Sequence, residues 1–155
     1  MMKILRSIVG EVRGAATIEL AIVAPILAAM VVGMSDLSTA YSTKLQVEQV
    51  AQRAIEKVQQ NGFKTTDETT LETEAATAAG ATASANVTFW KECTTSGGAR
   101  TTVGYTTDCG SGDSYAKYVQ IDVQKTYTPI IAARFAGSAV NNSFTVHGIA
   151  GVRIQ

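Results

Sequence analysis

The chain is poor in the residues that most often carry catalysis or bind metals. Its 155 residues include one histidine, two cysteines and one tryptophan, and aromatic residues make up only 6% of it. The histidine, His147, lies about forty residues from the nearer cysteine, and no CxxC pair occurs, so the usual zinc spacings are missing. We therefore expect no metal site, no catalytic residues and no cofactor, and we do not expect an enzyme.

The chain also has no net charge. Thirteen Lys and Arg residues balance thirteen Asp and Glu residues, so no basic field favours nucleic acid as a partner. Ala, Thr, Gly and Ser are abundant instead. This composition suits a secreted or surface structure of small residues better than an enzyme with a large core.

What is present is concentrated near the N-terminus. A basic leader ends at Gly14, Glu19 follows five residues later, and residues 20–35 carry no charge. As a helix this uncharged run spans about 24 Å at 1.5 Å per residue. Residues 15–19 bring it close to the roughly 30 Å hydrocarbon core of a bilayer. Because an ionisable residue in a membrane segment is costly, Glu19 is a candidate functional residue.

The charges on either side of the apolar run indicate its orientation. Basic residues precede the run, and the next one after it is Lys44. By the positive-inside rule, the N-terminus is cytoplasmic and the chain beyond about Asp36 lies outside. A cleaved secretory signal peptide with its cut near Ser38–Ala40 is the competing interpretation. Against it, the run is long for a signal core and Glu19 interrupts its start.

The segment RGAATIEL with the following apolar run resembles the prepilin leader of type IV pilus-like systems. More closely, it is similar to the TadE-like family of minor pilins and pseudopilins from tight-adherence (Flp-type) pilus machines. The resemblance implies that a prepilin peptidase cuts between Gly14 and Ala15, which makes Glu19 the fifth residue of the mature chain. It is strong over residues 13–34 and weaker beyond. One small departure is Leu20, which stands where many relatives have an aromatic residue.

The resemblance also implies partners and a role for the glutamate. The partners are the prepilin peptidase, other pilin and pseudopilin subunits, the inner-membrane assembly platform and the lipid bilayer. Glu19 would pair with the ammonium of Ala15 on a neighbouring subunit and set the axial register of assembly. The simpler alternative is a glutamate in the first helical turn that reaches to the interface. For Pro25, we consider both a simple kink and a weak point that bends when subunits pack.

The helix is predicted to continue beyond the membrane to Gln60. Apolar residues recur there at spacings of three and four: Leu37, Tyr41, Leu45, Val47, Ala51, Ala54, Ile55 and Val58. Asn61–Gly62 is a typical stop signal. We therefore expect a leader over residues 1–14, a transmembrane helix over 15–35, an amphipathic extension over 36–62 and an extracytoplasmic domain over 63–155.

The remaining patterns predict an α+β domain. Residues 64–85 favour a second helix, with Thr69 and Glu72 as a possible capping box. Period-two alternation predicts strands over residues 119–124 and 144–153, and residues 86–91 are a shorter third candidate. This order predicts a small antiparallel sheet laid on the long helix, with the second helix covering the strands.

Cys93 and Cys109 flank a loop of Thr, Ser, Gly and Asp residues. In an extracytoplasmic domain such a pair favours a disulfide, which stabilises a loop of this size by about 3 kcal/mol. Two free thiols are the alternative.

Two functional hypotheses follow. The first is a minor pilin or pseudopilin, a structural subunit for pilus assembly and surface attachment. It sits in the bacterial inner membrane with its domain in the periplasm and passes into the extracellular pilus on assembly. The second is a single-pass membrane-anchored binding module, with the loop between the cysteines as its recognition element.

Overall fold

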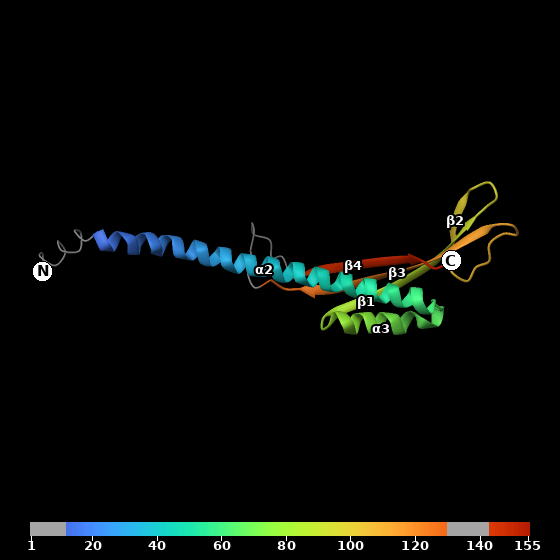
Figure 1. Ribbon diagram of the computed structural model, residues 1–155, viewed down its shortest axis with the longest axis horizontal. Coiled ribbons are helices and arrows are strands. Elements are labelled where there is room, and N and C mark those ends of the chain that lie inside the picture. Colours follow the sequence, from blue (N-terminus) through green and yellow to red (C-terminus); the bar gives the residue numbers. More distant parts are fainter. Residues whose placement is uncertain (1–11, 130–142) are drawn as a thin grey trace, which may run out of the picture.

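The computed structural model describes residues 12–129 and 143–155. Its elements are α2 (Val12–Asn61), the short 3-10 helix η1 (Thr65–Asp67), α3 (Glu68–Ala79), β1 (Ala83–Thr94), β2 (Arg100–Val103), β3 (Ser114–Tyr127) and β4 (Phe144–Arg153). Figure 1 shows a long helix whose second half lies along a small sheet, while its first half projects beyond it. The α+β prediction is confirmed. Most of the expected leader, residues 1–11, lies outside the described residues.

The sheet is antiparallel with the strand order β2-β1-β3-β4. Across its centre Val87 pairs with Ile121, and Ile121 pairs with Ala150. The strand predictions need correction. β3, with 14 residues, extends well beyond the strand expected around residues 119–124. β1 is twice as long as the expected residues 86–91, with 12 residues, and β2 was not predicted. Three of the four residues of β2 are exposed, so its sequence shows no apolar alternation. The strand is held instead by backbone hydrogen bonds to Lys91–Thr94 of β1.

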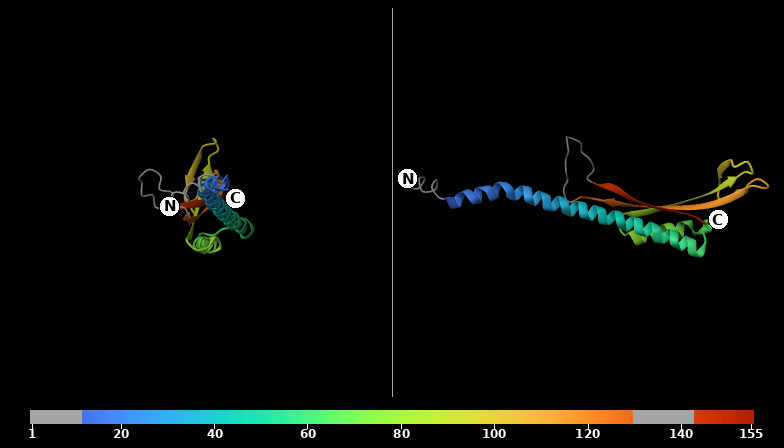
Figure 2. Two further views of the ribbon diagram at one scale, coloured as in Figure 1. Left: turned by 90° about the vertical axis from the view of Figure 1, so that its left-hand side faces the viewer. Right: turned by 45° about the horizontal axis from the view of Figure 1, so that its top comes forward.

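The two helices cover the same face of the sheet. α2 packs on β4 and β3, and α3 packs on β1 (Figure 2). The largest fully buried side chains are Ile121, Val47, Val119 and Val123. α2 ends where predicted, because Gly62 has a φ of 74°, a left-handed conformation that glycine adopts without strain.

One glycine sets how closely α2 approaches the sheet. A Cβ placed on Gly148 of β4 would lie 2.6 Å from the Glu48 nitrogen and closer still to the carbonyl group of Val47. Real Cβ atoms essentially never come that close. The strand therefore contacts the helix backbone itself, and glycine is required there.

The amphipathic stripe was predicted only in part. Val47, Ala51 and Val58 are buried as expected. However, Leu37, Tyr41 and Leu45 are 72%, 63% and 38% exposed. The buried face instead runs back along α2 through half-buried Ala40 and Asp36. A spacing of three and four fits either face of so long a helix, so the pattern alone did not separate them.

The predicted capping box is wrong. α3 begins at Glu68, so Thr69 lies inside the helix. The Glu72 carboxylate accepts a hydrogen bond of 2.8 Å from the backbone N–H of Val87 in β1. β2 pairs only with Lys91–Thr94 at the end of β1, so the rest of that edge of β1 has no neighbouring strand. The bond to Glu72 gives the Val87 N–H on this unpaired edge an acceptor.

Candidate functional site

The first candidate site is the N-terminal part of α2. The Gly14–Ala15 bond lies inside this 50-residue helix, near its start. Glu19 follows one helical turn after Ala15, and its side chain is exposed. Gly14, Ala15 and Glu19 are therefore close together along one helix.

The surface around Glu19 is apolar. Exposed large apolar side chains follow one another along this half of α2: Ile18, Leu20, Ile22, Val23, Ile26, Leu27, Met30, Val31 and Met34. Among the described residues, one helix is long and apolar enough to cross a membrane, and none of its most apolar window is buried in the protein. A core helix of a soluble protein would be mostly buried. Water is an unfavourable solvent for this surface, so it needs lipid or other apolar helices.

Pro25 lies within this apolar half, and α2 continues on both sides of it. Proline has no N–H, so the carbonyl of Ala21 lacks its usual partner four residues on. Further along, three hydroxyls bond back along the helix. Ser35 donates to the Val31 carbonyl, Thr39 to that of Ser35 and Thr43 to that of Thr39, each at 2.9 Å. These bonds give each hydroxyl a partner within the helix, just where the apolar segment ends.

The folded domain is tied to α2 just after the uncharged run. The hydroxyl of Tyr127, at the end of β3, lies 3.1 Å from Asp36 Oδ1 and 3.0 Å from the Asp36 carbonyl oxygen. Burial raises the pKa of Tyr127, and the hydrogen bond and negative charge of Asp36 raise this pKa further. The protonated hydroxyl is therefore the form that joins sheet and helix.

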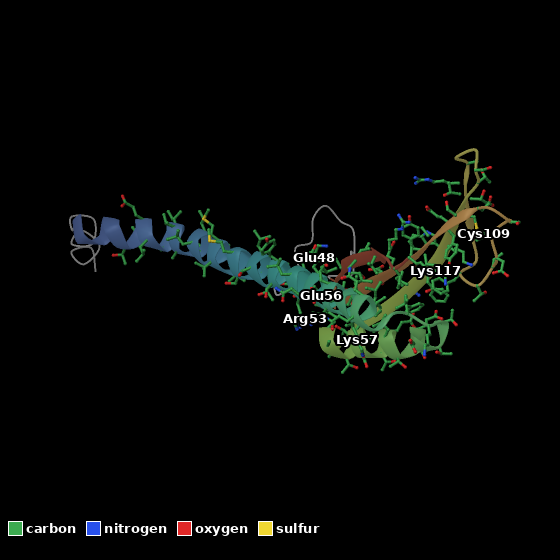
Figure 3. All side chains as sticks on the ribbon, turned by 45° about the vertical axis from the view of Figure 1, so that its right-hand side comes forward. Glu48, Arg53, Glu56, Lys57, Cys109 and Lys117 are labelled. Carbon is green, nitrogen blue, oxygen red and sulfur yellow. A yellow bond between two sulfur atoms is a disulfide. The ribbon has the colours of Figure 1, made fainter. Side chains whose placement is uncertain are left out.

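The second candidate site is the tip of the domain farthest from the apolar half of α2 (Figure 3). Cys93 and Cys109 form a disulfide with a Cα–Cα distance of 5.6 Å, which closes the loop that carries β2. Figure 3 places Cys109 at the end of the molecule opposite the apolar half of α2. Tyr105, from the same loop, packs edge-on against Phe63 and Phe89, with ring centroids 5.8 and 5.4 Å away. Burial raises the pKa of Tyr105.

A buried lysine supports this tip. Lys91 is 6% exposed, and its ammonium donates to the carbonyl of Thr107, two residues before Cys109. It also lies 5.4 Å from the ring centroid of Tyr115. Lys117, its cross-strand partner, lies 5.2 Å from the ring centroid of Tyr105. The disulfide thus holds in place the loop whose carbonyl and aromatic ring accommodate two opposed lysines.

No group of three or more His, Cys, Asp or Glu side chains in the described ranges could hold a metal ion. His147 is exposed on β4, and its Nδ1 lies 3.1 Å from Asp122 Oδ2 on β3. It is far along the sheet from the disulfide, so the cysteines and the histidine do not meet.

The structure brings the two cysteines together and keeps Gly14, Ala15 and Glu19 on one helix. It also contains contacts that the sequence did not reveal, above all Tyr127 with Asp36 and Lys91 with Thr107. Nothing in the sequence around Tyr127 indicates that it would contact Asp36 of the helix. Lys91 could have been noticed, because it occupies an inward-facing position in the alternation of β1, where a lysine is unusual.

Comparison with known proteins gives one match. The family model of TadE-like proteins matches residues 14–55 of this chain. This confirms the resemblance over the apolar half of α2 and most of its extension. No curated protein and no solved structure matches the chain.

Proposed function

We propose that this chain is a minor pilin or pseudopilin, a structural subunit that serves assembly of a tight-adherence pilus and surface attachment. One observation carries the proposal. The TadE-like match begins at Gly14, where the prepilin leader is expected to be cut, and Glu19 lies exposed one turn further on a helix whose apolar surface the protein does not bury.

In this proposal a prepilin peptidase cuts the Gly14–Ala15 bond and leaves a new ammonium at Ala15. A glutamate in the apolar part of a bilayer costs on the order of 3 kcal/mol on insertion scales. The Ala15 ammonium of a neighbouring subunit offsets that cost when the helices pack at the right axial offset. Glu19 therefore selects one register between subunits, and the apolar surface of α2 supplies the packing.

The proposal also assigns place and partners. The chain crosses the bacterial inner membrane once, with its N-terminus cytoplasmic and its α+β domain periplasmic, and it enters the extracellular pilus after assembly. Its partners are the prepilin peptidase, other pilin and pseudopilin subunits, the inner-membrane assembly platform and the lipid bilayer.

A second candidate function is a membrane-anchored binding module that is not incorporated in a pilus. The disulfide-closed tip favours it, because the loop between Cys93 and Cys109 stands farthest from the apolar helix and is built on a rigid support (Figure 1). The two functions differ in whether Glu19 is needed.

The test is Glu19→Ala in the native host. Without the charge, insertion becomes easier, but the partner of the Ala15 ammonium is lost. We expect the variant to accumulate in the inner membrane while pilus production and its recovery in sheared pili fall. Glu56→Ala is the matched control, since Glu56 is an exposed glutamate on the same helix outside the apolar segment. Normal piliation with Glu19→Ala would exclude the register role and leave the binding module.

A further inference from the structure

The end of the sheet that faces the apolar half of α2 carries aromatic residues. Tyr127 ends β3 and Phe144 begins β4, and their ring centroids lie 5.1 Å apart. Tyr41 lies on α2 five residues, or about 7.5 Å, beyond Asp36, which contacts the Tyr127 hydroxyl. Phe144 is 47% exposed and Tyr41 63% exposed. Tyr41, Tyr127 and Phe144 together are called the aromatic base below.

The height of the aromatic base along α2 follows from one contact. The Tyr127 hydroxyl lies 3.1 Å from Asp36 Oδ1, and Asp36 is the first charged residue after the uncharged residues 20–35. Figure 1 agrees, because the end of β3 and the start of β4 both point toward the projecting half of α2. The base therefore sits at the outer end of the apolar segment.

The thickness of a bilayer gives the depth at which the aromatic base would lie. A hydrocarbon core of about 30 Å takes about 20 residues of helix, so a core centred on residues 20–35 ends close to residue 38. The polar headgroups add roughly 5–7 Å on that side, which reaches about residue 42. Asp36 with its partner Tyr127, the attached Phe144 ring, and Tyr41 all fall at this boundary.

We infer that the aromatic base is an interfacial anchor: the exposed rings of Phe144 and Tyr41 insert at the headgroup boundary of the membrane that α2 spans, and buried Tyr127 supports the Phe144 ring from within the domain. The inference rests on the proposed membrane anchoring of α2. The amphipathic ring of Tyr41 is favoured at this depth, where one end meets hydrocarbon and the other meets water. Phe144 has no polar end and gains by the burial of apolar surface instead. The Phe144 ring would bury its exposed part there, while the Tyr127 hydroxyl keeps its bond to Asp36.

A second contact with the bilayer has a mechanical consequence. A single helix lets the domain tilt freely over the membrane, whereas contacts through both α2 and the sheet end fix its orientation. The subunit would then present its domain at one angle before assembly, and leaving the bilayer would break both contacts.

The experiment uses the only tryptophan as a built-in control. Trp90 pairs with Tyr118, nine residues from Tyr127 along β3, which places it about 30 Å from the base at 3.4 Å per residue. The probe is Trp90→Phe/Phe144→Trp, full-length, in phosphatidylcholine vesicles that contain lipids with a nitroxide at the headgroup or deep in the acyl chain. We expect headgroup nitroxide to reduce the fluorescence of this variant by about twofold or more, deep nitroxide to act less, and Trp90 of the wild type to be unaffected.

Two further variants keep the outcome decisive. Trp90→Phe/Val31→Trp places the probe in the apolar segment, where deep nitroxide must quench it if α2 is anchored. Trp90→Phe/Thr128→Trp places it at an exposed position beside Tyr127 without changing the Phe144 ring. Quenching at position 31 with none at 144 and 128 would overturn the interfacial anchor and leave the membrane anchoring intact. Absence of quenching at all three would instead contradict the anchoring itself. If lipid nitroxide does not quench the tryptophan at position 144, but its shielding from water increases with the protein-to-lipid ratio, then a second copy of the chain covers the Phe144 ring. That result would overturn the inference.

Discussion

Gly148→Ala tests whether backbone contact between β4 and α2 holds the domain on its helix. The added methyl would meet the Glu48 nitrogen at 2.6 Å and the carbonyl carbon and oxygen of Val47 at still shorter range. Ordinary contact begins at 3.4 Å, so helix and strand must separate by about 1 Å. All three atoms belong to the helix backbone, and no side chain can rotate away to relieve the overlap.

The separation has a cost that can be bounded. A gap of about 1 Å removes a quarter to a half of the dispersion energy of each contact it opens. Overpacking a well-packed core costs about 1–3 kcal/mol, and a clash with backbone belongs at the upper end. Replacing glycine by alanine also stabilises the fold by about 0.4–1 kcal/mol, because it lowers the conformational entropy of the unfolded chain. We therefore expect Gly148→Ala to lower the free energy of unfolding by about 2 kcal/mol.

Gly151→Ala is the matched control on the same strand. Its Cβ would lie 3.5 Å from the nearest atom, the Val119 carbonyl oxygen, which is ordinary contact. Only the unfolded-state effect remains, so we expect its stability to equal or slightly exceed that of the wild type.

The assay is urea unfolding of the full-length protein in non-denaturing detergent, followed by the fluorescence of Trp90, which lies in β1. With a typical slope for a small domain, Gly148→Ala should lower the urea midpoint by about 1 M or more relative to Gly151→Ala. Equal midpoints for the two variants would refute the close backbone contact as the determinant of helix position.

The remaining predictions concern the two ends of the domain. Cys93→Ser/Cys109→Ser should lose about 3 kcal/mol of stability in the same assay, and non-reducing peptide mapping of the wild type should recover the two cysteines as one linked pair. Freely alkylated thiols in natively isolated protein would rule the bond out. Because the folded-state pKa of Tyr127 is raised, its contribution is complete below about pH 10 and is lost as the pH rises through the folded pKa. Tyr127→Phe should therefore lose less stability than the wild type between neutral and strongly alkaline pH, and an identical alkaline loss would contradict the Asp36 contact.

The parts of the fold that were predictable are those with strong periodicity. Alternation in β3 and β4 identified both strands, and Asn61–Gly62 identified the end of α2. β2 was missed because its Thr-rich residues face solvent and only its backbone pairs with β1. Strand prediction reads side-chain burial, and this strand has almost none.

In the candidate site too, features set by local sequence were predictable and features set by long-range contacts were not. The apolar segment and Glu19 were identifiable because charge and hydropathy are properties of consecutive residues. The outward position of Leu37, Tyr41 and Leu45 depends on where the sheet ends against α2, and that is set by Tyr127 and Asp36, 91 residues apart in the chain. Local patterns do not contain such a contact, so the aromatic base became visible only in three dimensions.

The central claim is that the chain is processed as a prepilin, and the mature N-terminus tests it most directly. Mass spectrometry of protein isolated from its native membrane should find a terminus at Ala15, and Gly14→Leu should abolish it. A terminus at Tyr41, or an intact Met1 or Met2, would contradict prepilin processing and remove the ammonium on which the role of Glu19 depends.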